Sequence, residues 1–326
     1  MERFDVAIVG AGPAGTSTAI ELLERDPGRS VVLIEAIRRG NTLQEGAPGA
    51  GHSMCSGGLG RAMIEAIGWE IPREARMADI YRVILQTRQR TVEFSGDELG
   101  FEGPIAIVTN RKRFDDWLLG KAMALGAHYE PGVRVRSTAR VASGGPARWR
   151  IDTHGGRTFA ARALVGADGP ESATAKAHLA APPVPDDDMY LATEVYVQSS
   201  RFPKDAMLAR FQTSRIMGYY WAFRAGEVVK VGCGSSRTSG KQVSHETAWW
   251  RQELADQYGD PGFTGRVVDR VGGRITCAAP LLTVADPSKE VAVVGEAARA
   301  VLASLGAGDA TAVESGRALG RALAAG

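Results

Sequence analysis

The sequence predicts an α/β fold, in which a Rossmann-like domain carries an inserted mixed β-sheet region. Three observations support this prediction. Residues 6–35 read as a strand, a glycine-rich turn, a helix, a second strand and an acidic residue. The middle of the chain holds strand-like runs separated by turns. The last part returns to a strand, then to glycines that open a helix.

Composition places the chain among ordinary globular proteins, with 326 residues of which 44% are hydrophobic. The net charge of +2 argues against a nucleic-acid partner. Three cysteines are too few for a disulfide scaffold and indicate a reducing compartment. No apolar run approaches the ~18 residues of a membrane span, and Met1 lies close to the first strand. We therefore expect a cytoplasmic protein without a signal peptide, although peripheral membrane contact stays open.

The turn after the first strand is suited to binding a pyrophosphate. It reads Gly10-Ala11-Gly12-Pro13-Ala14-Gly15 and runs directly into a helix. Gly10 permits the tight turn, Gly12 lets the backbone approach the phosphates, and Gly15 lets the helix pack closely on the sheet. The helix N-terminus adds unpaired N–H groups and a positive dipole end.

Glu35 ends the second strand, about twenty residues after Gly15, the usual spacing in this motif. A carboxylate at that position accepts hydrogen bonds from the ribose hydroxyls of an adenosine. It also favours a free 2′-hydroxyl, and therefore FAD or NAD over NADP. The complete strand, turn, helix and acid pattern is far more specific than the glycines alone.

The following elements predict further sheet and helix. A loop of small residues at 41–53 leads through a glycine-dense stretch into a helix at 61–68, and strands follow at 81–85, 91–94 and 105–108. A helix is expected from about Thr109 to Leu125, with Gly126 as its C-cap. Strands at 149–153 and 158–165 form a hairpin around Gly155-Gly156.

Glycines recur where strands end and helices begin. The strand that ends at Val165 leads into Asp168-Gly169, which is either a cofactor contact at a sheet edge or an ordinary turn. A later strand at 291–294 ends in Gly295-Glu296, and Gly306-Ala307-Gly308-Asp309 opens the last helix. One extended cofactor could contact all of these segments. No second glycine motif follows a strand, so a separate nicotinamide domain is not expected.

A second region begins after the proline- and acid-rich segment 182–188. Strand-like runs occur at 193–197, 207–211, 218–223 and 228–232, followed by a helix at about 244–258. Strand alternation places Tyr219, Trp221 and Phe223 on one face, which suits a flat ring or a hydrophobic substrate. Core packing is the commoner use of such aromatic residues, and the pattern does not decide between them.

Taken together, these elements resemble the FAD-dependent family that includes the aromatic-hydroxylase-type monooxygenases, the flavin halogenases and the geranylgeranyl reductases. The resemblance runs from Asp5 to about Leu319. It implies a Rossmann-like FAD-binding domain of the glutathione reductase and aromatic hydroxylase type, with an inserted mixed β-sheet substrate domain. It further implies cofactor contacts at residues outside the first motif: Arg113, Val135, Asp168, Gly169, Gly295, Glu296, Gly306, Ala307, Gly308 and Asp309. Glu296 stands where the family usually has aspartate, and a bond to the ribityl chain is expected to survive.

Within this family the geranylgeranyl reductase branch is most similar. Met54-Cys55-Ser56-Gly57-Gly58-Leu59 resembles the cysteine-glycine segment of these reductases, and residues 219–223 resemble their Tyr-x-Trp-x-Phe motif. Two features depart from the branch. Ile216 and Arg224 replace the flanking prolines, and the chain lacks the added C-terminal helical region of many members. Arg224 at a cavity rim would suit a carboxylate or phosphate on the substrate.

The resemblance implies a discontinuous FAD-binding domain at 1–80, 105–180 and 275–326, and a substrate-binding region at 81–104 and 181–274. It implies hydride transfer between flavin N5 and a C=C, C–C or C–N bond of a hydrophobic substrate, such as an isoprenoid. Cys55 and His52 are the candidates to handle the proton, and a Cys55–Cys277 disulfide is a further possibility. The expected partners are a hydrophobic small molecule, an external electron donor such as NAD(P)H or ferredoxin, and a second copy in a homodimer. No metal site is predicted.

Two other functions are compatible with the residues. A single-component FAD monooxygenase, acting through a flavin C4a-hydroperoxide, would carry the same flavin-binding residues. A flavin or lipid carrier without turnover is disfavoured by the many glycine segments and the aromatic strand. The reaction with oxygen distinguishes a monooxygenase from a reductase. Reduction of the flavin by a physiological donor distinguishes a reductase from a carrier.

Overall fold

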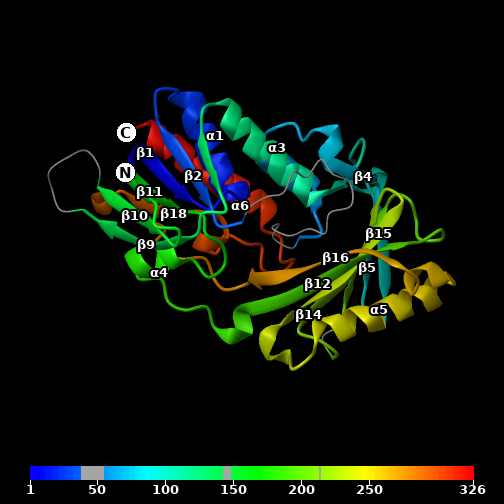
Figure 1. Cartoon of the computed structure of the whole chain (residues 1–326). Coiled ribbons are helices and arrows are strands. Elements are labelled where there is room, and N and C mark those ends of the chain that lie inside the picture. The colour runs from blue at the N-terminus through cyan, green and yellow to red at the C-terminus, as the bar shows by residue number, and fades with distance from the viewer. Residues whose placement is uncertain (38–54, 142–147, 213) are drawn as a thin grey trace. The chain divides into compact units, whose positions relative to one another are not determined.

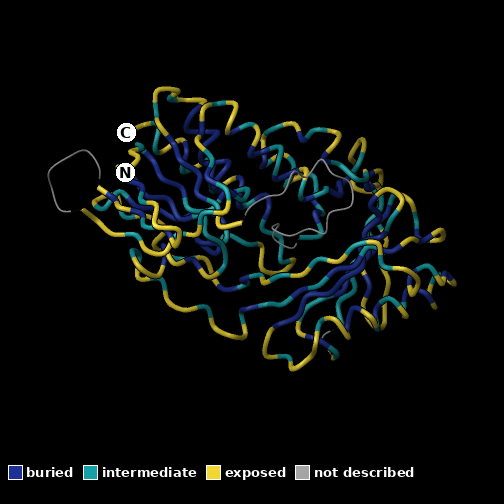
Figure 2. The backbone as a smooth tube through the Cα atoms, viewed as in Figure 1, coloured by how far each residue is buried: buried dark blue, intermediate teal, exposed yellow. Residues whose placement is uncertain are grey.

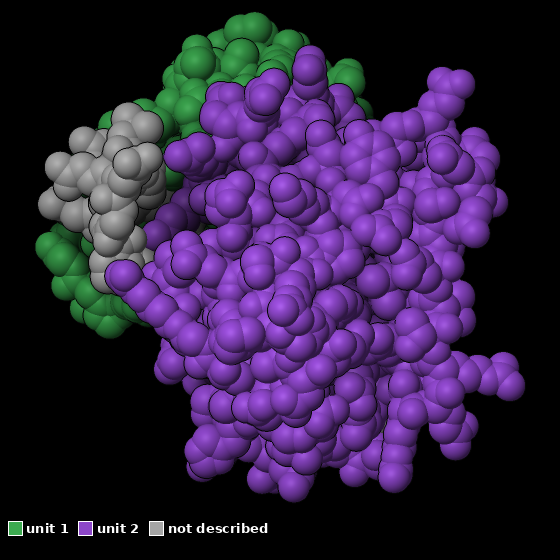
Figure 3. Space-filling view, turned by 90° about the vertical axis from the view of Figure 1, so that its right-hand side faces the viewer, with its two compact units in different colours: residues 1–44, 115–184, 276–326 green, residues 45–114, 185–275 purple. Residues whose placement is uncertain are grey.

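The computed structural model describes residues 1–37, 55–141, 148–212 and 214–326 (Figure 1). Its contacts divide the chain into two compact units, which Figure 3 colours separately. Unit 1 holds Met1–Gln44, Asp115–Val184 and Thr276–Gly326, and unit 2 holds Glu45–Phe114 and Pro185–Ile275. The predicted FAD-binding region also included 45–80 and 105–114, which these contacts group with unit 2. The division of the chain by function stays a prediction.

Unit 1 is built on an eight-stranded sheet. The strands follow the order β17-β18-β11-β1-β2-β8, with β10 beside β11 and β9 beside β10. Their bounds are β1 Glu2–Val9, β2 Val31–Glu35, β8 His128–Pro131, β9 Val135–Arg140, β10 Trp149–Thr153, β11 Thr158–Gly166, β17 Ala285–Asp286 and β18 Val291–Val293. The central strands β8, β2, β1, β11 and β18 run parallel, and β10 pairs antiparallel with β11 as the predicted hairpin. The predicted Rossmann-like α/β fold is confirmed.

Parallel strands of this sheet are apolar along their length because both faces are covered. Their buried core residues include Ala7, Val32, Ile34, Phe159 and Leu164. Four α-helices belong wholly or mostly to this unit: α1 Pro13–Arg25, α3 Arg111–Ala124, α4 Ala173–His178 and α6 Asp309–Ala324. Figure 2 shows the strands as buried segments between exposed turns.

Helices α1 and α6 come from opposite ends of the chain and pack backbone to backbone (Figure 1). A Cβ added to Gly316 would lie 2.3 Å from the Ala14 carbonyl oxygen, and one added to Gly320 would lie 2.8 Å from the Thr18 carbonyl oxygen. Only glycine permits that approach. Glu21 of α1 is 3% exposed and accepts hydrogen bonds from Arg25 and from Arg317 of α6. The helix pair therefore combines close packing with a buried ion pair.

Unit 2 contains two sheets. The larger has seven strands in the order β16-β12-β15-β14-β13-β5-β6. Their bounds are β5 Arg82–Gln86, β6 Thr91–Ser95, β12 Met189–Gln198, β13 Ala206–Phe211, β14 Gly218–Ala225, β15 Val228–Ser236 and β16 Val267–Thr276. The sheet is mixed, as predicted, because β13 and β5 run parallel while β12, β15, β14 and β13 pair antiparallel. The smaller sheet orders β3 Gly58–Gly60, β7 Ala106–Thr109 and β4 Arg76–Ile80.

The two faces of the seven-stranded sheet carry different clusters. Helix α5, Val243–Tyr258, covers one face and buries Trp250 and Leu254 against Tyr220, Val231 and Cys233. The opposite face contributes Trp221 and Phe223 to a second cluster, together with Ile80 and Val108 of the smaller sheet. Helix α2, Arg61–Ile67, follows β3. This second face is the one that the sequence predicts for a hydrophobic ligand.

Short 3₁₀ segments complete the description: η1 Arg73–Ala75, η2 Asp97–Leu99, η3 Asp186–Asp188, η4 Arg237–Ser239, η5 Pro261–Phe263, η6 Pro287–Lys289 and η7 Gly295–Ala298. The bounds predicted for α5, β13 and β14 are correct to within two residues, whereas β12 begins four residues before the predicted strand and β15 ends four residues after it. Among the described residues, no helix is long and apolar enough to cross a membrane.

Candidate functional site

The turn between β1 and α1 has the geometry that its glycines predict. Gly10 adopts φ +103°, and a Cβ there would lie 2.1 Å from the Ala167 carbonyl oxygen. A Cβ at Gly15 would lie 2.0 Å from the Gly10 carbonyl oxygen. These two glycines are therefore required by the fold itself. A Cβ at Gly12 would meet no described atom within 4 Å, so the space beside this residue is open.

The N-terminus of α1 fits a phosphate group. Gly12 is its N-cap residue without a side-chain cap, Pro13 begins the helix and Ala14 follows, and the first turn holds no acid. Helix α1 has 13 residues, and the peptide dipoles along it add up to a partial positive charge at its N-terminus. This charge and the first N–H groups of the helix lie beside the open space at Gly12. The residues present therefore fit the pyrophosphate of FAD.

Glu35 lies at the end of β2, beside this turn. Its carboxylate accepts hydrogen bonds from the Ala11 N–H and the Ile37 N–H, each at 2.9 Å. These bonds hold the acid at the carboxyl ends of parallel strands, where cofactors of open α/β sheets bind. Its contact with a ribose stays a prediction.

Asp168 and Gly169 follow β11. The carboxylate of Asp168 accepts hydrogen bonds from the Ser172 hydroxyl at 2.5 Å and from the Thr174 N–H at 3.0 Å. Gly169 adopts φ +80°. Asp168 thus fixes the start of α4, which is the ordinary structural use of an Asp-Gly turn. A cofactor contact at this pair stays a prediction.

The carboxy-terminal glycines pack against α1 and α6. Gly295 adopts φ +62°, and a Cβ there would lie 2.6 Å from the Ala14 Cβ. The neighbouring Glu296 carboxylate accepts a hydrogen bond from the Thr276 N–H at 2.8 Å. Residues 306–309, which comprise Gly306, Ala307, Gly308 and Asp309, lead into α6, whose N-cap Gly308 has no side-chain cap. This second helix N-terminus presents positive charge, but its first turn already carries the acidic Asp309.

Arg113, which is predicted to contact the cofactor, lies at the start of α3. Arg113 is exposed, and its Nη1 donates to the Glu74 carbonyl at 3.1 Å. Arg111, two residues earlier, is only 7% exposed. The cofactor contact of Arg113 stays a prediction. The sequence offers both arginines within three residues and no means of ranking them.

Val135, also predicted at the cofactor, begins β9 and packs against the core of the unit 1 sheet. It serves that core, and a cofactor contact stays a prediction. His52 lies outside the described residues. Cys55 is half-buried. It belongs to unit 2 and Cys277 belongs to unit 1, so a disulfide between them stays a prediction.

Tyr219, Trp221 and Phe223 share one face of β14, as alternation predicts. The rings of Tyr219 and Trp221 have centroids 5.5 Å apart, and Trp221 and Phe223 are buried. The Trp221 indole Nε1 donates to the Glu194 carboxylate at 2.6 Å. Glu194 is not among the predicted site residues, although a charged residue within the apolar run 191–197 is a recognisable signal.

Arg224 is a correction, because it does not lie at a cavity rim. It is 4% exposed and points to the face opposite Phe223. Its guanidinium donates to three backbone carbonyls, those of Ser199, Phe202 and Pro203. Burial lowers the pKa of Arg224 from its usual value. The residue stabilises a loop and is not available to a substrate anion.

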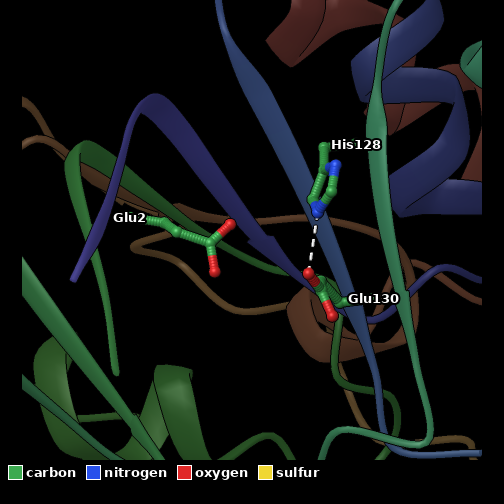
Figure 4. A group of neighbouring side chains, drawn as sticks. All are labelled: Glu2, His128 and Glu130. Carbon is green, nitrogen blue, oxygen red and sulfur yellow. Dashed lines mark hydrogen bonds and ion pairs between the residues drawn. The ribbon is translucent and has the colours of Figure 1, made fainter. Parts of the chain in front are cut away.

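One group of described side chains has the spacing of metal ligands. Glu2, His128 and Glu130 place ligand atoms within 4.8 Å of one another (Figure 4). The Glu130 carboxylate accepts a hydrogen bond from Arg157, which holds the pKa of Glu130 below its usual value, and it also contacts His128 at 2.7 Å. Arg157 reaches Glu2 as well, at 2.9 Å. The arginine already supplies the positive charge, so this is an ion-pair cluster at the surface of unit 1.

Comparison with known proteins agrees with this geometry. A family model described as FAD binding domain matches residues 3–326. Digeranylgeranylglycerophospholipid reductase 1 of Methanopyrus kandleri is 29% identical over 324 residues, which cover 98% of this chain and 80% of that protein.

Two solved structures share the fold. A geranylgeranyl bacteriochlorophyll reductase-like protein from Thermoplasma acidophilum superposes with a TM-score of 0.82 and 21% identity, over 100% of this chain and 79% of that one. A probable FAD-dependent monooxygenase from Pseudomonas aeruginosa, PqsL, superposes with a TM-score of 0.71 and 18% identity, over 99% and 86%. The chain therefore belongs to the FAD binding domain family, as an FAD-dependent oxidoreductase similar to the geranylgeranyl reductases.

Proposed function

We propose that the chain is a reductase of the geranylgeranyl type, which saturates a C=C bond of a hydrophobic substrate such as an isoprenoid. The observation that carries this proposal is the near full-length similarity to a protein named a digeranylgeranylglycerophospholipid reductase. The aromatic row Tyr219, Trp221 and Phe223 supports it, because aromatic side chains commonly line sites for apolar ligands. The correction at Arg224 removes the argument for an anionic substrate group at that position.

The chain's own residues supply binding and proton handling. Gly12 and the α1 N-terminus would hold the pyrophosphate of FAD, and Glu35 the adenosine ribose. When bound, FAD supplies hydride exchange with a substrate carbon. The uncapped N-terminus of α6 would favour negative charge near it.

Cys55 is the candidate to hold the proton that accompanies the hydride. Its sulfur accepts a hydrogen bond from the Gly57 N–H at 3.3 Å, which orients the thiol within its turn. A general acid for this step needs a pKa near the operating pH. His52 stays a second candidate outside the described residues.

The proposed partners follow from this chemistry. A reductase that ends each cycle with oxidised flavin needs an external donor, and we propose NAD(P)H or reduced ferredoxin for that role. A lipid-like substrate would favour peripheral contact with a membrane. A homodimer is the remaining proposal, and sedimentation of the purified protein tests it directly.

The test is an anaerobic reduction of the purified FAD-loaded protein, followed by mixing with a geranylgeranyl-bearing phospholipid. Flavin absorbance should return as the lipid is consumed, and mass spectrometry should show two added hydrogens per double bond. Admitting air in place of lipid should give reoxidation without an oxygenated product. An oxygen atom incorporated into a substrate would instead support the monooxygenase function. A protein that stays reduced with every prenylated acceptor would contradict the proposal.

Cys55→Ser tests the proton step separately, because serine keeps the approximate size of the side chain and replaces the thiol with a hydroxyl. We expect flavin content to be unchanged and the rate of reoxidation by lipid to fall. Contributions of general acids are typically about 10²–10⁴-fold in rate. An unchanged rate in this variant would remove Cys55 from the proton step while leaving the reductase proposal intact.

A further inference from the structure

A buried lysine lies under the turn that carries Cys55. Lys230, in the middle of β15, is 0% exposed. Its Nζ donates hydrogen bonds to the Ser56 carbonyl at 2.8 Å and to the Thr109 carbonyl at 3.0 Å. Its sequence neighbours, Val229 and Val231, point to the opposite face and belong to the apolar core under α5. Burying an ammonium is costly unless it is paired, so its position needs an explanation.

The turn at residues 55–57 is held on two sides. The Gly57 carbonyl accepts hydrogen bonds from the Thr109 N–H at 2.8 Å and from the Thr109 hydroxyl at 3.0 Å. Gly57 adopts φ +71°, and a Cβ there would lie 2.5 Å from the Thr109 carbonyl oxygen. Lys230 then ties the carbonyl of Ser56 to that same Thr109 carbonyl. The Gly57 N–H, which donates to the Cys55 sulfur, is fixed by this network.

Glu194 is the buried acid of the same sheet face. It lies opposite Gly232 on β15, two residues along that strand from Lys230, and is 0% exposed. One carboxylate oxygen accepts the Trp221 N–H, and the other has no hydrogen-bond partner among the described residues. Burial raises the pKa of Glu194, against the attraction of Lys230. Glu194 and Lys230 are therefore two ionisable groups buried on the same face of the sheet.

Tyr196 connects this cluster to Cys55. The Lys230 Nζ lies 5.1 Å from the centre of the Tyr196 ring. Burial raises the pKa of Tyr196, and nearby negative charge raises it further. The ionisable groups that act on its hydroxyl come from several elements: Glu194, Asp269, Cys55 and Arg111.

We propose that Lys230 is a positioning residue for Cys55, which holds the turn that carries the thiol and supplies positive charge that favours the thiolate. Two hydrogen bonds from Lys230 to backbone carbonyls support its role in holding the turn. The burial of its ammonium beside the turn supports its effect on the charge of the thiol. Low dielectric strengthens the effect of such a charge. The catalytic use of this thiol rests on the function proposed above, whereas its chemical reactivity does not.

The test is the pH dependence of Cys55 alkylation by iodoacetamide in the purified FAD-loaded protein. A Cys277→Ser background removes one competing thiol. Cys233 is fully buried, and burial raises the pKa of its thiol to about 12, so it reacts slowly. Lys230→Gln keeps a hydrogen-bond donor and loses the charge, and Lys230→Met loses both. Lys241→Gln removes an exposed lysine of the same unit and is the matched control.

We expect the midpoint of the rate–pH profile to rise by about one pH unit in Lys230→Gln, and not in Lys241→Gln. Lys230→Met should show the same shift and also a lower plateau rate, because the turn loses its anchor. If Lys230→Met does not fold, Lys230→Gln decides alone. A wild-type midpoint in Lys230→Gln, with melting temperature preserved, would overturn the proposal. A shifted midpoint in a protein that reduces no prenylated lipid would uphold Lys230 and reject the proposed reductase.

Discussion

Gly12→Val places a side chain in the open space in front of helix α1 without straining the protein. Gly12 adopts φ −70°, which any residue accepts, and its added Cβ meets no described atom within 4 Å. The variant should therefore fold with wild-type stability. The branched side chain would occupy the space where a phosphate must approach the first N–H groups of the helix.

The size of the effect follows from the bonds that are lost. A hydrogen bond to a charged group contributes about 1.5–3 kcal/mol, so the loss of two phosphate contacts costs about 3–6 kcal/mol. At about 1.4 kcal/mol per tenfold change, the affinity for FAD should fall by at least about 100-fold. The purified variant should then carry little flavin.

Flavin absorbance per chain and titration of the apoprotein with FAD measure this change. Gly120→Val is the matched control, because Gly120 of α3 is exposed and also has no described atom within 4 Å of an added Cβ. It should retain full flavin content. Normal FAD affinity in a folded Gly12→Val protein would refute our placement of the pyrophosphate.

Further predictions concern the α1–α6 pair. Glu21→Gln should lower the free energy of unfolding by about 2 kcal/mol, below the 3–5 kcal/mol of a fully buried pair, because Arg25 is half-exposed. Burial raises the pKa of Glu21, but hydrogen bonds from Arg317 and Arg25 outweigh it and lower the pKa. The stabilisation by Glu21 is therefore fully present above the unfolded pKa of about 4.5, and it is lost as pH falls through the lower pKa of the folded protein. Urea unfolding should show the free energies of unfolding of the variant and the wild type converging at acid pH. Gly316→Val should cost about 1–3 kcal/mol by overpacking, whereas Gly120→Ala should not destabilise, and equal melting temperatures for these two would contradict the packing argument.

Local signals predicted the first motif and most of the strands, but not β4 or the ten-residue β16. The turn at 10–15 needs only the conformational freedom of glycine and the start of a helix, both of which are encoded within a few residues. Alternation placed Tyr219, Trp221 and Phe223 on one face for the same reason, since the period of a strand is a local property. Pairing between strands that are far apart in the sequence could also be expected, because parallel strands are joined by long crossover connections.

Side-chain partners could not be predicted in this way. Arg111 and Arg113 differ in burial because α3 turns one of them inward, and the sequence near Thr109 does not reveal which. Arg224 was expected beside substrate, yet its donors are taken by the loop around Phe202, more than twenty residues away along the chain. Such contacts depend on the packing of distant segments.

Gly232 shows how the aromatic row and the buried charges depend on one another. A Cβ at Gly232 would lie 2.5 Å from the Trp221 ring, so the missing side chain gives the indole room to lie across β15 and reach Glu194. The indole lies over β15. Lys230 of the same strand donates a hydrogen bond to the carbonyl of Ser56, which follows Cys55. Trp221, Lys230 and Glu194 therefore lie on the same face of three adjacent strands, β14, β15 and β12.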